Sequence, residues 1–197
     1  MKSLKIFSVI LLVAVGVEMS AQSKTSLYYT MGIPMGNTND FIDKASFRGM
    51  GFEYQYMLTD RFALGGVIQW NTFYKELGKG TYPIENGEIN GYQYRYINTV
   101  PMYATGTFYL ASDDATIRPY IGLGVGTYWL EKRLDMGLYA DITNSWHFGL
   151  IPKAGILLPL SYSNSLYLGI DYNIAFKNSE LDQQSWLGIS VGFNFDY

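Results

Sequence analysis

The 197-residue sequence contains no cysteine, and this absence excludes several kinds of chemistry. Without cysteine there is no disulfide framework, no thiolate metal site and no thiol nucleophile. The single histidine leaves only scattered carboxylates as other metal ligands, so we predict no metal and no cofactor. Charged residues make up only 16%, the formal net charge is −3, and no run of lysine or arginine occurs. We therefore expect no nucleic-acid partner.

Long apolar runs are also scarce, and the one clear example stands at the start of the chain. Residues 6–17, IFSVILLVAVGV, follow Lys2 and Lys5 and precede a small residue, Ala21. A basic start, a short apolar core and a small residue before the cut are typical of a secretory signal peptide, and the core is too short to span a bilayer as a helix. We therefore expect a signal peptide over residues 1–21 and one domain over 22–197.

Aromatic residues and glycine are abundant, and they are arranged with a period of two. Aromatic residues make up 17% of the chain, which includes 18 tyrosines and 21 glycines. In residues 121–126, large apolar side chains at odd positions alternate with glycine at even positions. In residues 166–176, apolar side chains alternate with polar or small residues in the same way. This alternation predicts β-strands with one apolar face and one polar or glycine face.

Eight such segments are predicted, and the connections between them alternate in length. The segments span residues 25–36, 47–58, 61–74, 92–110, 117–130, 146–160, 166–176 and 186–197. The longer, polar connections are residues 37–46, 75–91, 131–145 and 177–185. In an antiparallel meander every second connection lies at the same end, so the short and long connections separate to opposite ends. The pattern predicts an all-β fold, a closed eight-stranded antiparallel up-and-down transmembrane barrel.

The bulk of the side chains decides which face points inward. The interior of an eight-stranded barrel is just wide enough for its side chains to fill, so the large apolar set would crowd it. Turning glycine and polar residues inward leaves the apolar residues facing lipid. Within the inward set we predict a charge network in the lumen, because buried charges must be paired. Its members are Glu53, Arg95, Lys153 and Asp171.

The tryptophans support the same orientation. All four map to strand ends next to the long connections, where a membrane interface favours aromatic rings. We interpret them as an interfacial girdle consisting of Trp70, Trp129, Trp146 and Trp186, although Trp186 has the inward parity of its strand.

The last predicted strand alternates to the final residue of the chain. Its apolar positions are Ile189, Val191, Phe193, Phe195 and Tyr197. Pairing with the first strand would close the barrel, because each unpaired backbone group in hydrocarbon costs several kcal/mol. Together with the signal peptide, the eight segments and RPYIGLGVG at the fifth segment, this strand resembles the small outer-membrane β-barrel family of Gram-negative bacteria. That group includes outer-membrane protein X, outer-membrane protein W and the membrane domain of outer-membrane protein A.

The resemblance implies a location and partners. It implies that the last strand is a C-terminal insertion signal read by the barrel-insertion machinery. It also implies that the barrel lies in outer-membrane lipid of a Gram-negative bacterium, with both ends of the mature chain in the periplasm. Members of the family include adhesins, structural anchors, channels for small apolar molecules and lipid-modifying enzymes, so the fold alone does not choose a function.

We favour a structural or surface-interaction role without catalysis, with an extracellular ligand at loops 75–91 and 131–145. The alternative is a narrow channel for small or apolar solutes, and the third reading is a lipid-modifying enzyme. An enzyme would need His147 as base, Ser145 as nucleophile and an orienting acid. The candidate acids are Asp135 and Asp141. Family deacylases place these groups on the lipid-facing surface, whereas the parity of His147 is inward. A soluble ligand-binding barrel is a fourth reading.

Overall fold

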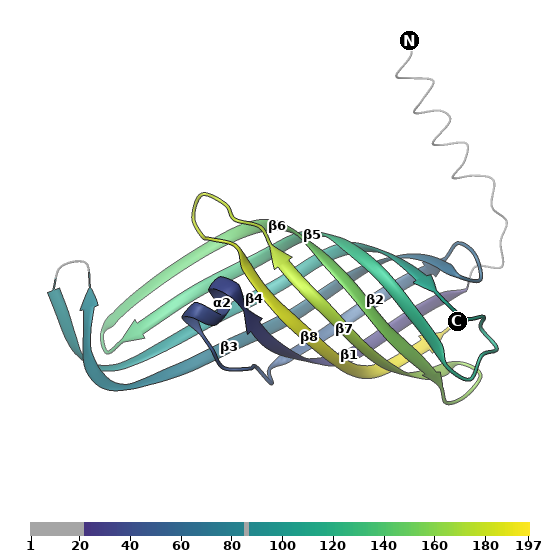
Figure 1. The fold of residues 1–197 in the computed structure, drawn as a ribbon, viewed down its shortest axis with the longest axis horizontal. Helices are drawn as coiled ribbons and strands as arrows, with labels where there is room; N and C mark the ends of the chain where they lie inside the picture. Colours follow the sequence, from purple (N-terminus) through teal and green to yellow (C-terminus); the bar gives the residue numbers. More distant parts are fainter. Residues whose placement is uncertain (1–21, 85–86) are drawn as a thin grey trace, which may run out of the picture.

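Eight strands close into a single antiparallel barrel (Figure 1). The computed structural model describes residues 22–84 and 87–197, so the predicted signal peptide lies outside the described residues. The elements are β1 (Ser23–Met35), α2 (Gly36–Phe41), β2 (Gly49–Met57), β3 (Phe62–Ile84), β4 (Gly87–Tyr109), β5 (Arg118–Met136), β6 (Tyr139–Pro159), β7 (Asn164–Ala175) and β8 (Gln184–Asp196). Each strand pairs with the next, and β8 pairs with β1. The predicted fold class is confirmed.

The two faces of the barrel wall are divided as the alternation predicts. Large apolar side chains such as Phe52, Leu123 and Phe148 are exposed on the outer face, as expected of a barrel whose outer wall faces lipid. Glycine, polar residues and tyrosine point inward. No helix among the described residues is long and apolar enough to cross a membrane.

The seam between β1 and β8 closes the cylinder. Its register runs from Lys24↔Asp196 to Met35↔Ser185 without interruption. At one end of the seam, Ser23 and Tyr197 exchange backbone hydrogen bonds of 3.1 and 2.9 Å. We call this the terminal end of the barrel, and it also carries the short connections 58–61, 110–117 and 160–163. The opposite end, which carries α2 and two long hairpins, is the hairpin end.

Residues 75–91 and 131–145 were predicted to be loops, and this prediction is wrong because both segments are largely strand. The β3–β4 ladder continues to Ile84↔Gly87, with a register shift between Leu77 and Gly80, and the β5–β6 ladder continues to Met136↔Tyr139. The extensions project beyond the rest of the wall, the β3–β4 hairpin farthest (Figure 1). Beyond the apolar band neither face of a strand needs to be apolar, so the hydrogen-bond ladder continues after the apolar alternation has ended.

The connection 37–46 contains a short helix that the sequence pattern did not predict. Helix α2 starts at Gly36, whose φ of +50° favours glycine, and it ends where the Ile42 N–H donates to the Thr38 carbonyl at 2.8 Å. The Thr38 hydroxyl donates to Gln184 Oε1 at 2.9 Å and accepts from the Ser185 N–H at 3.0 Å. These bonds fasten α2 to the start of β8.

Candidate functional site

An ion pair occupies the centre of the barrel interior. Glu53 on β2 and Lys153 on β6 are 1% and 7% exposed, and the Lys153 ammonium donates to Glu53 Oε1. The same oxygen accepts from Gln55 Nε2 at 2.8 Å and from the Thr105 hydroxyl at 3.4 Å. Both charges are therefore compensated by partners inside the barrel, which burial of a charge requires.

The structure brings a third predicted lumen residue, Asp171, next to this pair. Asp171 lies directly opposite Lys153 in the β6–β7 register, and its carboxylate accepts from the Asn173 amide. On the other side, Gly188 of β8 leaves space for the carboxylate, since a Cβ at this position would lie 2.5 Å from Asp171 Oδ2. Glu53 and Lys153 thus form an ion pair, and Asp171 lies beside Lys153 on the neighbouring strand, so the three residues form one cluster.

Arg95 lies apart from this cluster, so its predicted place in the network was wrong. Its Nη1 donates to the Phe41 carbonyl at 3.1 Å, and the guanidinium lies 5.0 Å from the centroid of the Phe41 ring. The Lys132 ammonium lies 4.2 Å from the same centroid. The inward face of β4 continues past the ion pair into the hairpin extension, where α2 packs. Arg95 therefore holds α2 rather than a lumen carboxylate.

Tyrosines fill the lumen around the ion pair. Tyr28 and Tyr167 stack with centroids 5.0 Å apart, and Tyr120 lies 5.9 Å from Tyr167. Tyr28, Tyr103, Tyr109, Tyr120, Tyr128 and Tyr167 are all buried. The rings occupy the space beside inward glycines, so a Cβ at Gly155 would lie 2.5 Å from the Tyr120 hydroxyl. The alternation places Tyr128 and Tyr167 on the same face as the inward glycines, but it did not predict that tyrosines fill the lumen.

An apolar layer closes the lumen toward the hairpin end. Trp186 is fully buried and makes edge-on contacts with Phe73 and Tyr128, at centroid distances of 5.9 and 5.7 Å. Ile42, next to α2, is buried in the same cluster. Trp186 is therefore not an interfacial residue, because the even positions of β8 point inward.

The other three tryptophans of the predicted girdle lie on the outer face. Trp70 and Trp146 are 43% and 59% exposed, and Trp129 is half-buried. They lie on β3, β6 and β5, toward the hairpin end of the apolar band. The apolar positions of the predicted insertion signal, Ile189, Val191, Phe193, Phe195 and Tyr197, all lie on the outward parity of β8 or at its end.

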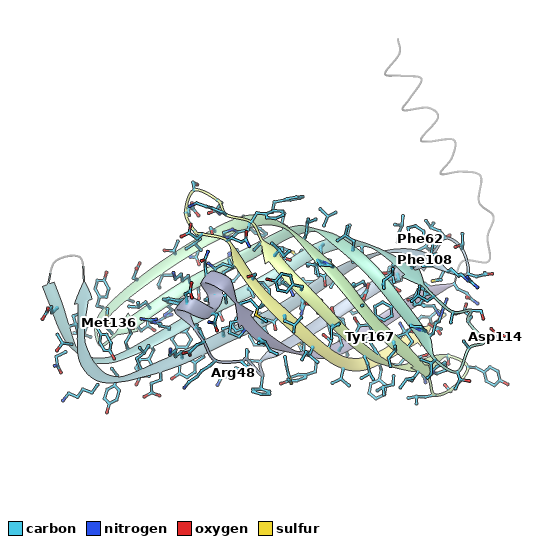
Figure 2. The ribbon with its side chains drawn as sticks, viewed as in Figure 1. Arg48, Phe62, Phe108, Asp114, Met136 and Tyr167 are labelled. Atoms are coloured by element: carbon cyan, nitrogen blue, oxygen red, sulfur yellow. The ribbon has the colours of Figure 1, made fainter. Side chains whose placement is uncertain are left out.

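The terminal end of the lumen contains a second charged cluster, which sequence reasoning missed. The Lys24 ammonium lies 2.8 Å from Asp196 Oδ1 and 3.3 Å from Asp113 Oδ1. Arg118 donates to the same Asp113 carboxylate, and its Nη2 donates to the Asp60 carbonyl at 2.8 Å. Its guanidinium also covers the Tyr109 ring at 4.0 Å. The inward parity of Lys24 and Arg118 was the signal that could have identified it. In Figure 2, Asp114 marks the connection 110–117 beside this cluster, and Met136 marks the tip of the β5–β6 hairpin at the opposite end of the barrel.

Ser145 and His147 are in contact inside the barrel. The Ser145 hydroxyl lies 2.7 Å from His147 Nε2, and His147 Nδ1 lies 2.7 Å from the Phe176 carbonyl. A carbonyl only accepts, so Nδ1 carries the proton and Ser145 donates to Nε2. Both side chains are buried, and Asp135 is bonded to Arg133 at 2.9 Å instead. Strand β7 ends at Ala175, so His147 supplies a hydrogen-bond donor to the next carbonyl, that of Phe176.

Residues 22–84 and 87–197 contain no group of three or more histidine, aspartate or glutamate side chains placed to hold a metal ion.

Three tyrosines form a strip on the outer face of the β3–β4 hairpin. Tyr74 stacks with Tyr94 at 6.4 Å and lies 5.0 Å from Tyr96. Below the strip, the Thr72 hydroxyl donates to Asn98 Oδ1 at 2.8 Å, and Asn98 Nδ2 donates to Glu131 Oε1 at 2.9 Å. Polar outer residues thus begin immediately beyond Trp70, which marks the height at which the apolar band ends.

An ion pair between Asp43 and Lys75 ties the α2 loop to the β3 extension, and it predicts a titration. The Lys75 ammonium, 2.9 Å away, holds the pKa of the exposed Asp43 carboxyl below its ordinary value of 3.8. Because the pKa of Asp43 is lower in the folded than in the unfolded chain, the ionised carboxylate stabilises the docked loop above pH 3.8. This stabilisation is lost as the pH falls through the pKa of the folded chain. Carbon-13 NMR should show Asp43 titrating below pH 3.8 in the native chain and returning toward that value in Lys75→Met. An unchanged titration in the variant would contradict the ion pair.

The barrel is similar to solved outer-membrane proteins. It matches Ail, the attachment invasion locus protein of Yersinia pestis, at 12% identity over 91% of this chain and 100% of that chain, with a TM-score of 0.56. OprG of Pseudomonas aeruginosa matches at 13% identity over 90% and 96% of the two chains, with a TM-score of 0.57. Neisserial surface protein A matches at 13% identity over 91% and 98%, with a TM-score of 0.53. At these identities the likeness concerns the fold.

Sequence comparison supplies the family. No curated protein sequence matches the chain. The family model described as "Outer membrane protein beta-barrel domain" matches residues 7–195. The resemblance drawn from the strand pattern is thereby confirmed, and the chain belongs to the outer membrane protein β-barrel domain family.

Proposed function

We propose that this protein is a surface-interaction and structural barrel of the outer membrane, without catalytic activity, whose hairpin end faces the outside of the cell. The observation that carries the proposal is the contrast between the two parts of the molecule. The lumen is filled with side chains at three successive heights, while two hairpins extend well beyond the wall. A filled barrel that projects rigid strands presents a surface rather than a passage.

The filled lumen favours this role over a narrow channel. A solute would have to pass the Lys24–Asp196 cluster, the tyrosine layer around Glu53 and the layer around Trp186. Eight strands leave room for side chains and no aqueous channel, so passage would require all three layers to rearrange. The buried Ser145–His147 pair lacks an exposed nucleophile, which speaks against the lipid-modifying alternative.

The composition of the hairpin end indicates the kind of partner. Tyr92 is exposed and Tyr74, Tyr94 and Tyr96 are partly exposed, and tyrosines provide large, rigid contact surfaces at low entropic cost. Several cations there are paired with acids, as in Lys75–Asp43, Arg133–Asp135 and Lys177–Asp182. The Ail structure contains the heparin analogue sucrose octasulfate. These three paired cations suit a polyanion of that kind poorly, so we infer a protein or a neutral glycan as the partner of the hairpins.

A hairpin truncation tests the proposal. Glu76 and Tyr94 are cross-strand partners, as are Lys132 and Thr143, so each pair can be joined by an Asn-Gly turn without disturbing the wall below. Cells displaying the native chain should adhere to an immobilised panel of host matrix proteins and neutral glycans, and the truncated variant should lose most of this adhesion. Unheated gel mobility should stay native in both, and hairpin cleavage by protease added to whole cells checks the orientation.

Three results would oppose the proposal. Equal adhesion of native and truncated chains would remove the hairpins from the interaction. Steady single-channel conductance of the purified native barrel in planar bilayers would favour the channel. A change in lipid acylation on expression, lost in His147→Ala, would restore the enzyme.

A further inference from the structure

A groove crosses the outer wall of the barrel at strands β8, β1, β2 and β3. It has a volume of about 520 Å³ and is lined mainly by apolar side chains of the lipid-facing surface. The outward residues that form it are Leu27, Tyr29, Met50, Trp70, Val191 and Phe193. Since these residues lie within the apolar band, the groove has the surroundings of a lipid acyl chain.

Arg48 stands at the hairpin end of this groove. It precedes β2 on the outward parity of Met50, is exposed, and projects from the barrel wall (Figure 2). Its backbone carbonyl accepts from Thr72, so it lies at the height of the polar Thr72–Asn98–Glu131 chain. The apolar band therefore ends at Arg48, which is where the headgroup of a lipid in the groove would lie.

The charge of Arg48 has no acidic partner within residues 22–84 and 87–197. The ion pairs of these residues involve other cations, and the described side-chain contact of the guanidinium is with the Tyr74 ring, 5.8 Å from its centroid. Arg133, on the same outer side of the hairpin end, is instead held by two bonds of 2.9 Å to Asp135.

The segment that carries Arg48 is fixed in place. The Tyr29 hydroxyl, inside the groove, donates to the Phe47 carbonyl, and the Arg48 N–H donates to the Ser46 hydroxyl at 3.1 Å. Ser46 in turn donates to the Thr72 carbonyl at 2.5 Å. Contacts on both sides therefore set the position of Arg48 relative to the groove.

A second outer groove provides a comparison. Its volume is about 540 Å³, and it crosses β6, β7, β8 and β1 between Ala154 and Ile189. No charged residue lines it. That groove can accommodate an acyl chain but has no group that recognises a headgroup. The combination of an acyl-sized groove and an unpaired cation at the membrane boundary distinguishes the groove at Arg48.

We propose that this groove binds one phosphate-bearing membrane lipid, with an acyl chain along Met50 and Val191 and the phosphate on the Arg48 guanidinium. The planar guanidinium matches two phosphate oxygens, so the contact is charge-assisted and can be bidentate. The site lies on the barrel wall below the hairpin residues that the truncation removes, and it selects the lipid by its headgroup charge.

Trp70 lines the groove and reports on its occupant. A reporter chain with Trp129→Phe and Trp146→Phe retains Trp70 and the buried Trp186, and a matched chain with Trp70→Phe and Trp129→Phe retains Trp146 on the far wall. Each is refolded into phosphatidylcholine vesicles containing a minor fraction of phosphatidylglycerol with brominated acyl chains. We expect the fluorescence of Trp70 to be quenched more strongly than the bulk fraction of brominated lipid predicts. The fluorescence of Trp146 should be quenched in proportion to that bulk fraction.

Three variants distinguish the contribution of the Arg48 charge to lipid binding from the contribution of the groove. Arg48→Met should lower the relative association constant of brominated phosphatidylglycerol at Trp70 about tenfold, the size of one charge-assisted hydrogen bond. Arg133→Met, which removes a cation already paired with Asp135, should leave it unchanged. Val191→Phe, which fills the groove, should lower it with Arg48 intact. Native gel mobility of each variant shows that the barrel is folded.

The outcomes decide the proposal. Brominated diacylglycerol, which has the chains without the phosphate, should quench Trp70 only as the bulk fraction predicts. Equal quenching by diacylglycerol would show that the groove takes any chain, and an unchanged Arg48→Met chain would remove the headgroup contact. Displacement of phosphatidylglycerol by millimolar inorganic phosphate alone would assign a free anion in place of a lipid. Each of these three results overturns the lipid site, and none affects the hairpin truncation test.

Discussion

Replacing Lys153 by methionine should lower the free energy of unfolding by about 3–5 kcal/mol, the usual effect of removing one partner from a buried ion pair. The substitution leaves the buried Glu53 without its paired cation, and the buried Asp171 without the cation opposite it in the strand register. The Lys24 and Arg118 cations are engaged with Asp113 at the terminal end and do not replace it. Urea unfolding of the barrel in lipid vesicles, followed by tryptophan fluorescence, measures the change.

The opposite substitution should be milder. In Glu53→Gln the amide still accepts from Gln55 and Thr105, and Lys153 keeps Asp171 opposite it. The double variant Glu53→Gln, Lys153→Met should recover part of the loss, because only Asp171 then lacks a cation, and protonation can neutralise a single carboxyl. If Lys153→Met and Glu53→Gln had equal effects that added in the double variant, the three residues would not form one coupled cluster.

Adding a side chain at Gly149 should be nearly as damaging. A Cβ at this inward position of β6 would meet the Ile174 carbonyl oxygen and would lie 2.5 Å from Tyr128 Cε2. The carbonyl belongs to the neighbouring strand and cannot turn away as a side chain can. Gly149→Val should therefore destabilise the barrel by about 3 kcal/mol, at the upper end for overpacking, and reduce the fraction with native gel mobility.

Gly66 on β3 is the matched control. It faces outward, and nothing lies within 4 Å of a Cβ built on it. Valine has a higher strand propensity than glycine and meets lipid here, so Gly66→Val should be neutral or stabilising in the same unfolding measurement. Equal losses at Gly66 and Gly149 would mean that the barrel needs glycine for backbone reasons, and not for the space that Tyr128 fills.

The fold was predictable because lipid imposes a strict rule on each strand. Inside the apolar band most outward residues are apolar, so the eight segments and their faces could be derived from alternation. Beyond the band the rule no longer applies, and the β3–β4 and β5–β6 extensions read as polar loops. Helix α2, with six residues and no apolar period, left no signal of this kind.

The prediction of the site was limited to what parity determines, which is whether a side chain faces inward or outward. Parity placed Glu53, Lys153 and Asp171 on the inner face, and their similar heights brought them together. Parity also placed Arg95 on the inner face, but the position of Arg95 along the barrel axis determines that its partner is Phe41. Trp186 shows the opposite error, because its residue type suggested the interface while its parity indicated the interior. Where residue type and parity disagreed, parity was correct.

The seam between β1 and β8 also constrains how the protein acquires its structure. The Lys24–Asp196 contact joins residues 172 positions apart, so nearly the whole chain lies within the ring that this contact closes. Closing so long a loop is entropically unfavourable, and its contacts form only after all the intervening hairpins are available. Until then both outer strands present open edges that attract other chains. Folding speed and resistance to aggregation therefore depend on the last strand reaching the first, which makes the final residues of the sequence a kinetic determinant.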